Sequence, residues 1–200
     1  MNLNNKNSHK TEESPFQMPV ALPITGRSST ITNVFVNSII PVIPPSREEI
    51  CTALEILDLD PNNVKCAYCG DVATEWDHLH PIVKNKKPTG YISEIHNLVP
   101  ACGKCNQSKG NKDWLIWMES DAALSPKSRG ISDIENKKYH LQEYEKWGPR
   151  INIDFASVVG KNIWDEHWKN CEKIQDMLRD SQIIAQKIKT EVEEKLRSSK

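Results

Sequence analysis

The sequence lacks a charge excess of either sign, a long apolar run and an internal repeat. Its formal net charge at pH 7 is −1, so any attraction to nucleic acid must come from a local patch. No apolar run approaches the roughly 20 residues that a membrane helix needs, and the polar start lacks the apolar core of a signal peptide. We therefore expect a cytoplasmic protein with no membrane contact.

The six cysteines are expected to be metal ligands or core residues, because thiols stay reduced in the cytoplasm. Four of them form two C-x-x-C pairs, CAYC at 66–69 and CGKC at 102–105. Two such turns can complete a closed tetrahedral zinc site that leaves no position for substrate. The pattern predicts a structural Zn²⁺ held by Cys66, Cys69, Cys102 and Cys105.

Composition divides the chain into four regions. Residues 1–30 are rich in Asn, Ser, Thr and Lys with few apolar anchors, which predicts a disordered or loosely draped arm. Residues 31–62 combine a strand-like run with a helix that should pack on the core. Residues 63–120 contain both cysteine pairs, and residues 121–200 are expected to be helical.

The two halves of the second region have different local preferences. The run ITNVFVNSIIPVI, from residue 31, is rich in β-branched residues, which favours a strand. Ser46 followed by Glu49 is the pattern of a capping box, and apolar residues then recur on one face. A helix that ends before Pro61 is predicted.

Residues 162–197 contain neither glycine nor proline, and their apolar residues recur at spacings mostly of three and four. This pattern predicts a long amphipathic helix, with a break near residues 179–181 as one alternative. Eight basic and eight acidic residues balance in residues 162–200, which favours packing or a homodimer interface over DNA contact. Cys51 and Cys171 lie on apolar helix faces and should fill the core.

The segment between the cysteine pairs predicts a strand, a loop and a second strand. VATEWDHLHPI has strand content up to Pro81, and the short run NLVPA leads into the second cysteine pair. NQSKGNK, after Cys105, can form a short helix that ends at Gly110. Tyr68, inside the first cysteine pair, should pack over the metal site.

The order C-x-x-C, D-H, N-L-x-P and C-x-x-C-N-x-x-K-G across residues 66–112 resembles the HNH endonuclease family in its zinc-stapled ββα-metal form. The resemblance implies an α+β fold, with a zinc-stapled ββα-metal core, flanking helices and a long C-terminal amphipathic helix. It also implies hydrolysis of phosphodiester bonds in double-stranded DNA that leaves 5′-phosphate and 3′-hydroxyl ends.

The resemblance assigns a role to four residues. His78 matches the general base, since a neutral imidazole can take a proton from water near pH 7. Asp77 and Asn106 match the ligands of the catalytic ion, and hard oxygen ligands suit Mg²⁺ or Mn²⁺ rather than a second zinc. Asn97 matches the residue that holds the histidine-bearing loop and ring. Asn106 departs from the pattern, because many members have histidine there.

Neighbours on an ideal strand point to opposite faces, so Asp77 and His78 can address one phosphate only if the strand is bent or bulged. His80 could contact a phosphate, although a structural histidine bonded to a carbonyl is the favoured alternative. Glu75 could be a carboxylate that supports the metal ligands or, as we favour, a solvated strand residue.

Lysine dominates the charge near this motif. From residue 84 to residue 112 there are six lysines and one acid, a local net charge of +5. Lys109 and Lys112 follow Asn106 closely and are expected to contact flanking phosphates. A solvated loop is the alternative for the lysines at 84–87.

Three functions remain open at this stage: a metal-dependent DNA endonuclease, a zinc module that binds DNA without cutting it, and an interaction scaffold built on the long helix. The joint presence of the acid, the base and the two asparagines favours the nuclease. A type II restriction endonuclease is the first choice, and a phage or mobile-element nicking enzyme is the alternative.

Overall fold

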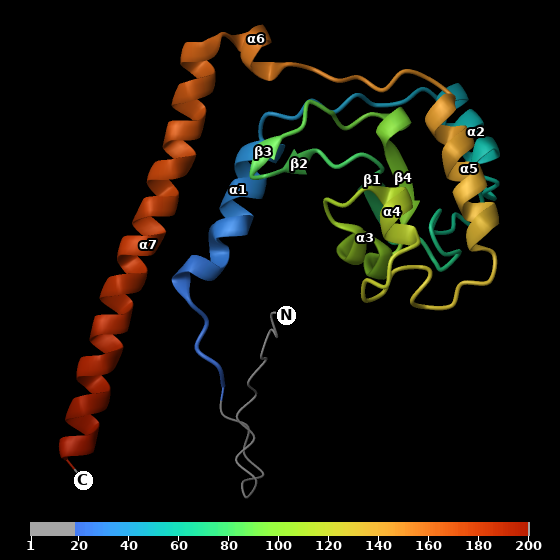
Figure 1. Ribbon diagram of the computed structural model, residues 1–200. Helices are drawn as coiled ribbons and strands as arrows, with labels where there is room; N and C mark the ends of the chain where they lie inside the picture. Colours follow the sequence, from blue (N-terminus) through green and yellow to red (C-terminus); the bar gives the residue numbers. More distant parts are fainter. Residues whose placement is uncertain (1–18, 200) are drawn as a thin grey trace, which may run out of the picture.

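The computed structural model describes residues 19–199 (Figure 1). Helices surround a small sheet, which is the expected α+β architecture. The elements in chain order are η1 Ile24–Arg27, α1 Ser28–Asn37, α2 Arg47–Ile56, β1 Glu75–His78, β2 Val83–Lys84, β3 Lys87–Pro88, η2 Ile95–Asn97, β4 Leu98–Ala101, α3 Gly103–Lys109, α4 Trp114–Met118, α5 Ile134–Lys146, α6 Phe155–Val159 and α7 Lys161–Ser198.

The predicted strand, loop, strand and helix are present as β1, a connection that contains the β2–β3 hairpin, β4 and α3. Strand β1 pairs antiparallel with β4 in a one-to-one register, from Glu75 opposite Ala101 to His78 opposite Leu98. Of the two expected alternatives, a bend or a bulge at the acid and the histidine, the bulge is therefore wrong. The paired strand instead ends at His78, and the chain bends at residues 79 and 80.

Two hydrophobic cores form. The first lies around the β1–β4 sheet and joins the cysteines to α2, α4 and α5, with Leu79, Val99 and Trp117 fully buried. The second joins α1, α7 and the connection between β1 and β4; its buried residues are Val36, Ile40, Ile82, Ile92, Trp168 and Cys171. Figure 1 shows α1 and α7 on one side of the sheet and α2 and α5 on the other.

The strand expected from residue 31 is wrong, because residues 28–37 form helix α1. Val36 is fully buried in the second core, and Gln175 of α7 donates a 2.8 Å hydrogen bond to the Ser28 carbonyl of α1. Tertiary packing on α7 thus overrides the local preference of β-branched residues for strands. Of the arm expected over residues 1–30, residues 1–18 lie outside the described residues, while η1 and the start of α1 occupy most of the remainder.

Helix α2 has the predicted capping box. The Glu49 amide donates to the Ser46 hydroxyl at 3.2 Å, and the Ser46 amide donates to the Glu49 carboxylate at 2.7 Å. The helix ends at Ile56, before Pro61 as expected. Cys51 is exposed on α2, so the expectation that it fills the core is wrong, whereas Cys171 is buried as expected.

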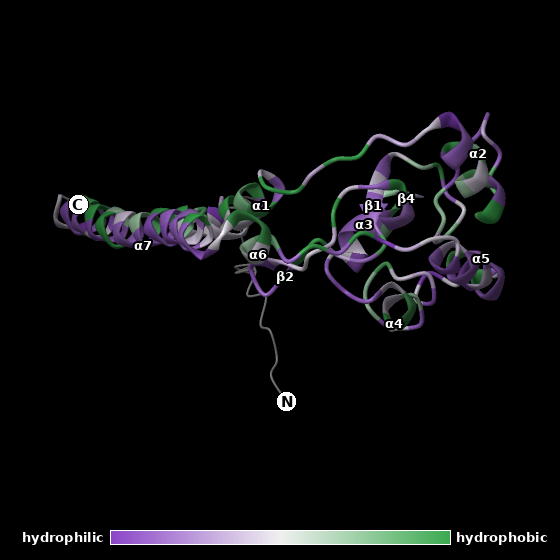
Figure 2. Ribbon diagram, turned by 90° about the horizontal axis from the view of Figure 1, so that it is seen from above, coloured by the Kyte–Doolittle hydropathy of each residue, from purple (hydrophilic) through white to green (hydrophobic). Residues whose placement is uncertain are grey.

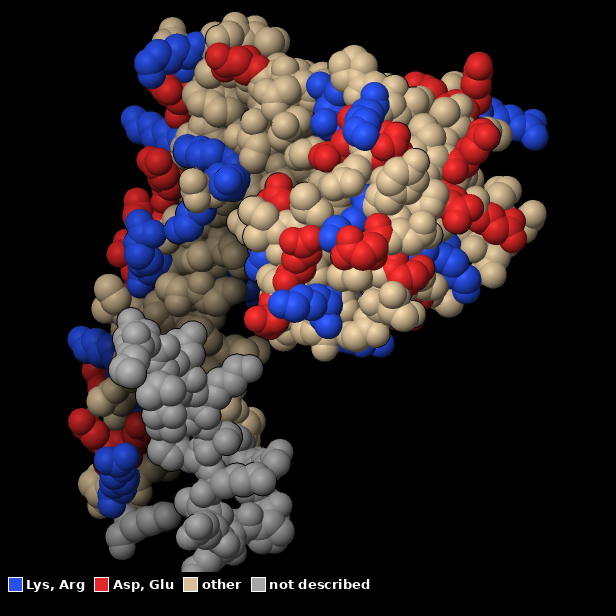
Figure 3. Space-filling model, turned by 45° about the vertical axis from the view of Figure 1, so that its right-hand side comes forward, with Lys and Arg blue, Asp and Glu red and all other residues tan. Residues whose placement is uncertain are grey.

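Helix α7 is continuous over 38 residues, so the alternative of a break near residue 180 is wrong. It packs on α1 and on η1, where the Ile24 amide donates a hydrogen bond to Gln182, and its C-terminal end then extends away from the other described elements (Figure 2). An apolar stripe on α7, at least half exposed at each position, consists of Met177, Ile184, Ile188, Val192 and Leu196. Figure 3 shows acidic and basic side chains interspersed over the face that it displays. Across residues 19–199, no helix has both the length and the apolar character needed to span a membrane.

Candidate functional site

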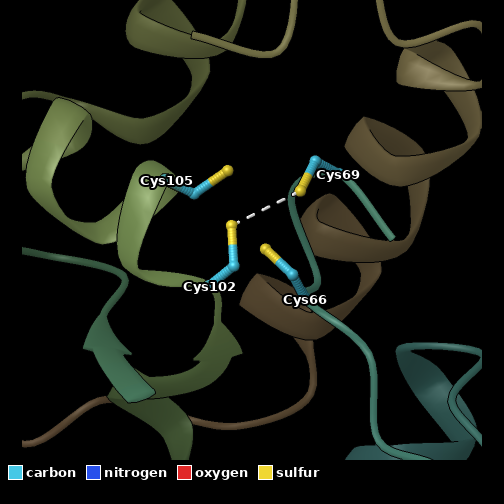
Figure 4. A group of neighbouring side chains, drawn as sticks. All are labelled: Cys66, Cys69, Cys102 and Cys105. Atoms are coloured by element: carbon cyan, nitrogen blue, oxygen red, sulfur yellow. Dashed lines mark hydrogen bonds between the residues drawn. The ribbon is translucent and has the colours of Figure 1, made fainter. Parts of the chain in front are cut away.

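The two C-x-x-C pairs meet in space. All four sulfur atoms lie within 4.8 Å of one another, and all four cysteines are buried. Cys102 is the N-cap of α3 and Cys105 lies in its first turn, whereas Cys66 and Cys69 come from the turn before β1. Figure 4 shows the four sulfur atoms directed toward a common centre. The Sγ atoms of Cys69 and Cys102 lie 3.6 Å apart. The cluster can hold one metal ion.

The electrostatics of this cluster favour a cation. Hydrogen bonds with Cys66 and Cys69 raise the pKa of the Cys105 thiol, and a hydrogen bond with Cys105 lowers the pKa of Cys69. A thiolate at Cys69 thus disfavours a second one at Cys105, and this repulsion is offset by nearby positive charge. Arg129 supplies part of it: its guanidinium lies 3.4 Å from the Cys105 sulfur and 2.6 Å from an Asp71 carboxylate oxygen.

A separate cavity of about 560 Å³ lies beside β1 and α3. Asp77, His78 and Asn106 all line it, so the three residues that the sequence proposes for chemistry face one space. The cavity is also lined by Asn33 and Asn37 of α1, by Asn111, and by Pro81, Ile82, Val83 and Gly110. The second core thus contributes one wall of the cavity.

Asp77 is buried, and one of its carboxylate oxygens has two donors. The Tyr68 hydroxyl donates to Oδ2 at 2.6 Å, and the Lys109 ammonium lies 3.0 Å from the same atom. Burial raises the pKa of Asp77, while Lys109 and Tyr68 act in the opposite direction. Within residues 19–199 the second oxygen, Oδ1, makes no hydrogen bond, so it is free to bind a cation.

His78 is held by Ser93, whose Oγ lies 2.8 Å from Nε2. Burial, together with the charge of Lys109, lowers the pKa of His78 to about 4. The imidazole is therefore neutral at pH 7 and can accept a proton. Lys109 also donates a 2.7 Å hydrogen bond to the His78 carbonyl, which ties α3 to the end of β1.

Asn106 lies on α3 and donates a hydrogen bond from Nδ2 to a Glu75 carboxylate oxygen at 2.5 Å. Its amide nitrogen is thereby assigned, which leaves the carbonyl oxygen for another partner. In Asp77 and in Asn106, one polar atom of the side chain is therefore held by neighbouring residues. The remaining oxygen of each side chain is left for a metal ion. Such a pair suits a hard divalent cation.

Asn97 is buried and bonds the loop after β1. Its side-chain oxygen accepts from the His80 amide at 2.8 Å, and its side-chain nitrogen donates to the carbonyls of His80 and Ile92 at 3.1 and 3.3 Å. These bonds join the loop after β1 to the segment that precedes η2. The ring of His78 itself is bonded by Ser93 rather than by Asn97.

The residues proposed for substrate contact have other partners. His80 Nε2 lies within hydrogen-bond distance, 2.7 Å, of a Glu145 carboxylate oxygen on α5, so His80 has a structural partner. Lys109 is fully buried with its ammonium on Asp77, so its placement does not support the phosphate contact expected of it. Lys112 is exposed and donates to the Ser108 carbonyl at 2.6 Å, and Lys87 lies over the Trp168 ring.

Sequence reasoning missed several residues of the site. Ser93, Arg129 and the asparagines of α1 come close to it only through long-range folding, and no local pattern marks them. Tyr68 carries a signal, because it lies inside a C-x-x-C turn, but its bond to Asp77 depends on how that turn packs against β1.

Comparison with known proteins supports the resemblance to the HNH endonuclease family. The family model HNH endonuclease matches residues 66–112. The CRISPR-associated endonuclease Cas9 of Corynebacterium diphtheriae is 40% identical over 62 residues, which cover 29% of this chain and 5% of that protein. No solved structure gives a significant match. Residues 66–112, which contain the four cysteines, Asp77, His78 and Asn106, are therefore an HNH endonuclease domain.

Proposed function

We propose that the protein is a metal-dependent endonuclease that hydrolyses phosphodiester bonds in double-stranded DNA. The observation that carries the proposal is the shared cavity of Asp77, His78 and Asn106, next to a buried four-cysteine cluster. A module that only binds DNA has no need for an oriented carboxylate, a neutral buried histidine and an oriented amide in one cavity.

The cysteine cluster is proposed to hold Zn²⁺ with a structural role. Four thiolates complete a tetrahedral shell and leave no position for substrate. The cluster joins the turn before β1 to the start of α3, and these are the elements that carry the cavity residues. Reduced thiols and a DNA substrate both suit the cytoplasm.

The catalytic ion is proposed to be Mg²⁺ or Mn²⁺, held by Asp77 and Asn106. When bound, such an ion neutralises charge on the phosphate and on the departing 3′ oxygen. Two protein oxygens leave most of its coordination shell to water and phosphate, as Mg²⁺ prefers.

His78 is proposed to take the proton from the attacking water. With Nε2 protonated and donating to Ser93 Oγ, 2.8 Å away, the lone pair of Nδ1 is left for that proton. Because the pKa of His78 is lowered to about 4, the imidazole is in the required form at pH 7. The amides of Asn33, Asn37 and Asn111 are suited to donate hydrogen bonds to the phosphate backbone at the cavity wall.

A type II restriction endonuclease is the finer proposal, since two copies related by a two-fold axis would cut both strands of a palindrome. The apolar stripe of α7 supports a homodimer, because it is exposed on a helix that extends beyond the second core. A nicking enzyme of a phage or mobile element is the alternative, and it would act as a monomer.

The test is digestion of a supercoiled plasmid with purified protein in Mg²⁺ or Mn²⁺, followed by sequencing of the cut ends. Linear fragments of discrete size support a restriction enzyme, and open circles alone support nicking. The ends should carry 5′-phosphate and 3′-hydroxyl groups. If neither metal gives any cleavage in a preparation that contains zinc and is folded, the nuclease proposal fails.

A further inference from the structure

Tyr68 connects the two metal sites that the proposed function requires. It lies between Cys66 and Cys69 in the first C-x-x-C turn, so its backbone belongs to the sulfur cluster. Its hydroxyl donates a 2.6 Å hydrogen bond to Oδ2 of Asp77, on β1. One side chain thus runs from the structural site to a ligand of the catalytic ion.

The Tyr68 hydroxyl is held rigidly. The side chain is fully buried, and its ring meets Trp117 edge-on at a centroid distance of 5.2 Å. A buried aromatic ring packed in this way has one accessible orientation. The position of the hydroxyl is therefore set by the geometry of the cysteine turn.

Two donors meet on the same atom of Asp77. Tyr68 and Lys109 both bond Oδ2, so among the described residues Oδ1 is the oxygen of this cavity-lining side chain that has no hydrogen bond. The buried ammonium of Lys109 is shared between Oδ2 and the carbonyls of His78 and Gly110, whereas among the described residues the Tyr68 hydroxyl donates to Oδ2 alone. Tyr68 is accordingly the contact that can define the orientation of the carboxylate.

We propose that Tyr68 is a positioning residue: its hydroxyl orients the Asp77 carboxylate, so that the affinity of the catalytic ion depends on the cysteine turn. The proposal rests on the proposed function. Groups that orient a metal ligand typically contribute about 10- to 100-fold to metal affinity or activity. Without the hydroxyl, the carboxylate gains rotational freedom that metal binding must remove.

The test compares Tyr68→Phe with Tyr144→Phe. Tyr144 is also fully buried in the first core, and its hydroxyl bonds the carbonyls of Ile95 and Leu98 rather than Asp77. Both substitutions keep the aromatic ring and remove one buried hydroxyl. A loss of stability alone would therefore affect both variants.

The primary measurement is the Kd for Mn²⁺ without DNA, from a titration followed by electron paramagnetic resonance, together with zinc content and Tm. Tyr68→Phe should raise the Kd about 10-fold with one zinc retained, and saturating Mn²⁺ should restore most of its kcat. Tyr144→Phe should leave the Kd unchanged.

Equal Kd values for wild type and Tyr68→Phe overturn the inference alone. A rise of the same size in Tyr144→Phe also overturns it, because the effect would then be one of general stability. Asp77→Asn is the reference for the site. If the wild-type protein binds no Mn²⁺, or if Asp77→Asn leaves Mn²⁺ binding unchanged, the proposed catalytic site is overturned as well.

Discussion

Glu75 and Asn106 are joined by a 2.5 Å hydrogen bond from the Asn106 amide nitrogen to a Glu75 carboxylate oxygen, which connects β1 to α3. Glu75 is therefore not only a solvated strand residue. Its carboxylate determines which atom of the Asn106 amide is left for a metal ion. Three side chains that are not themselves proposed ligands, Glu75, Tyr68 and Lys109, thus contact the two that are.

Replacing Glu75 by Gln should weaken binding of the catalytic ion. The amide that replaces the carboxylate no longer offers a charged acceptor to Asn106, so the Kd for Mn²⁺ should rise about 10-fold, with zinc content unchanged. The matched control is Glu143→Gln, which removes an exposed carboxylate paired with Lys146. Unchanged metal dependence in Glu75→Gln would show that the bond to Asn106 has no functional role.

His78→Ala should abolish cleavage while DNA binding and zinc content stay near normal. Loss of a general base typically costs on the order of 10²- to 10⁴-fold in kcat. His80→Ala is the control, because His80 bonds Glu145 rather than lining the cavity, so it should lower Tm and leave kcat near wild type. Cleavage that survives in His78→Ala would mean that another group is the base.

Removal of the cysteine-bound metal should unfold the first core. The free energy of metal binding at a four-cysteine site contributes directly to the free energy of folding. Cys102→Ser, or treatment with a strong chelator, should therefore abolish cooperative thermal unfolding. Circular dichroism and atomic absorption give the two readouts. Cys51→Ser provides the control, since Cys51 is exposed on α2 and should leave both unchanged. A cooperative, zinc-free Cys102→Ser variant would contradict the structural role.

The pair between His80 and Glu145 should contribute stability that disappears in acid. The hydrogen bond from His80 lowers the pKa of Glu145, so the unfolded chain binds more protons near this pKa than the folded chain does. The contribution is therefore present above the ordinary glutamate pKa of about 4.3 and is lost as pH falls through the lowered value.

The measurement is Tm from pH 7 to pH 3 for wild type and Glu145→Gln. At pH 7 the variant should melt roughly 2 °C lower, as is typical of a partly exposed pair, and the gap should close toward pH 3. A gap that is constant with pH would assign the difference to packing rather than to charge.

The apolar stripe of α7 should mediate a homodimer. Ile184→Glu with Ile188→Glu places charges in the stripe and should convert a dimer into a monomer of 22.8 kDa by light scattering. Ile183→Glu is the control, because Ile183 is equally exposed but lies on another face of the helix. If wild-type protein is already monomeric, the dimer proposal is wrong and the nicking alternative gains support.

Local signals account for the parts of the structure that were predicted correctly. The capping box at Ser46 and Glu49 predicts the start of α2, because both partners lie within one turn. The spacing of apolar residues without glycine or proline predicts α7. The incorrect prediction of a strand at residues 31–43 has the opposite cause: the conformation of α1 depends on its contacts with α7, more than a hundred residues away.

The sequence by itself determined the identity of the domain through the resemblance of one composite motif, in which metal chemistry restricts the residue types: two C-x-x-C pairs, an acid beside a histidine, and an asparagine directly after the second pair. Only the tertiary structure decided how these side chains are oriented. Four polar groups reach their partners across separate elements: the hydroxyls of Tyr68 and Ser93, the carboxylate of Glu75 and the ammonium of Lys109. Hydrogen bonds of this kind depend on distances and angles in space, which spacing along the chain does not specify.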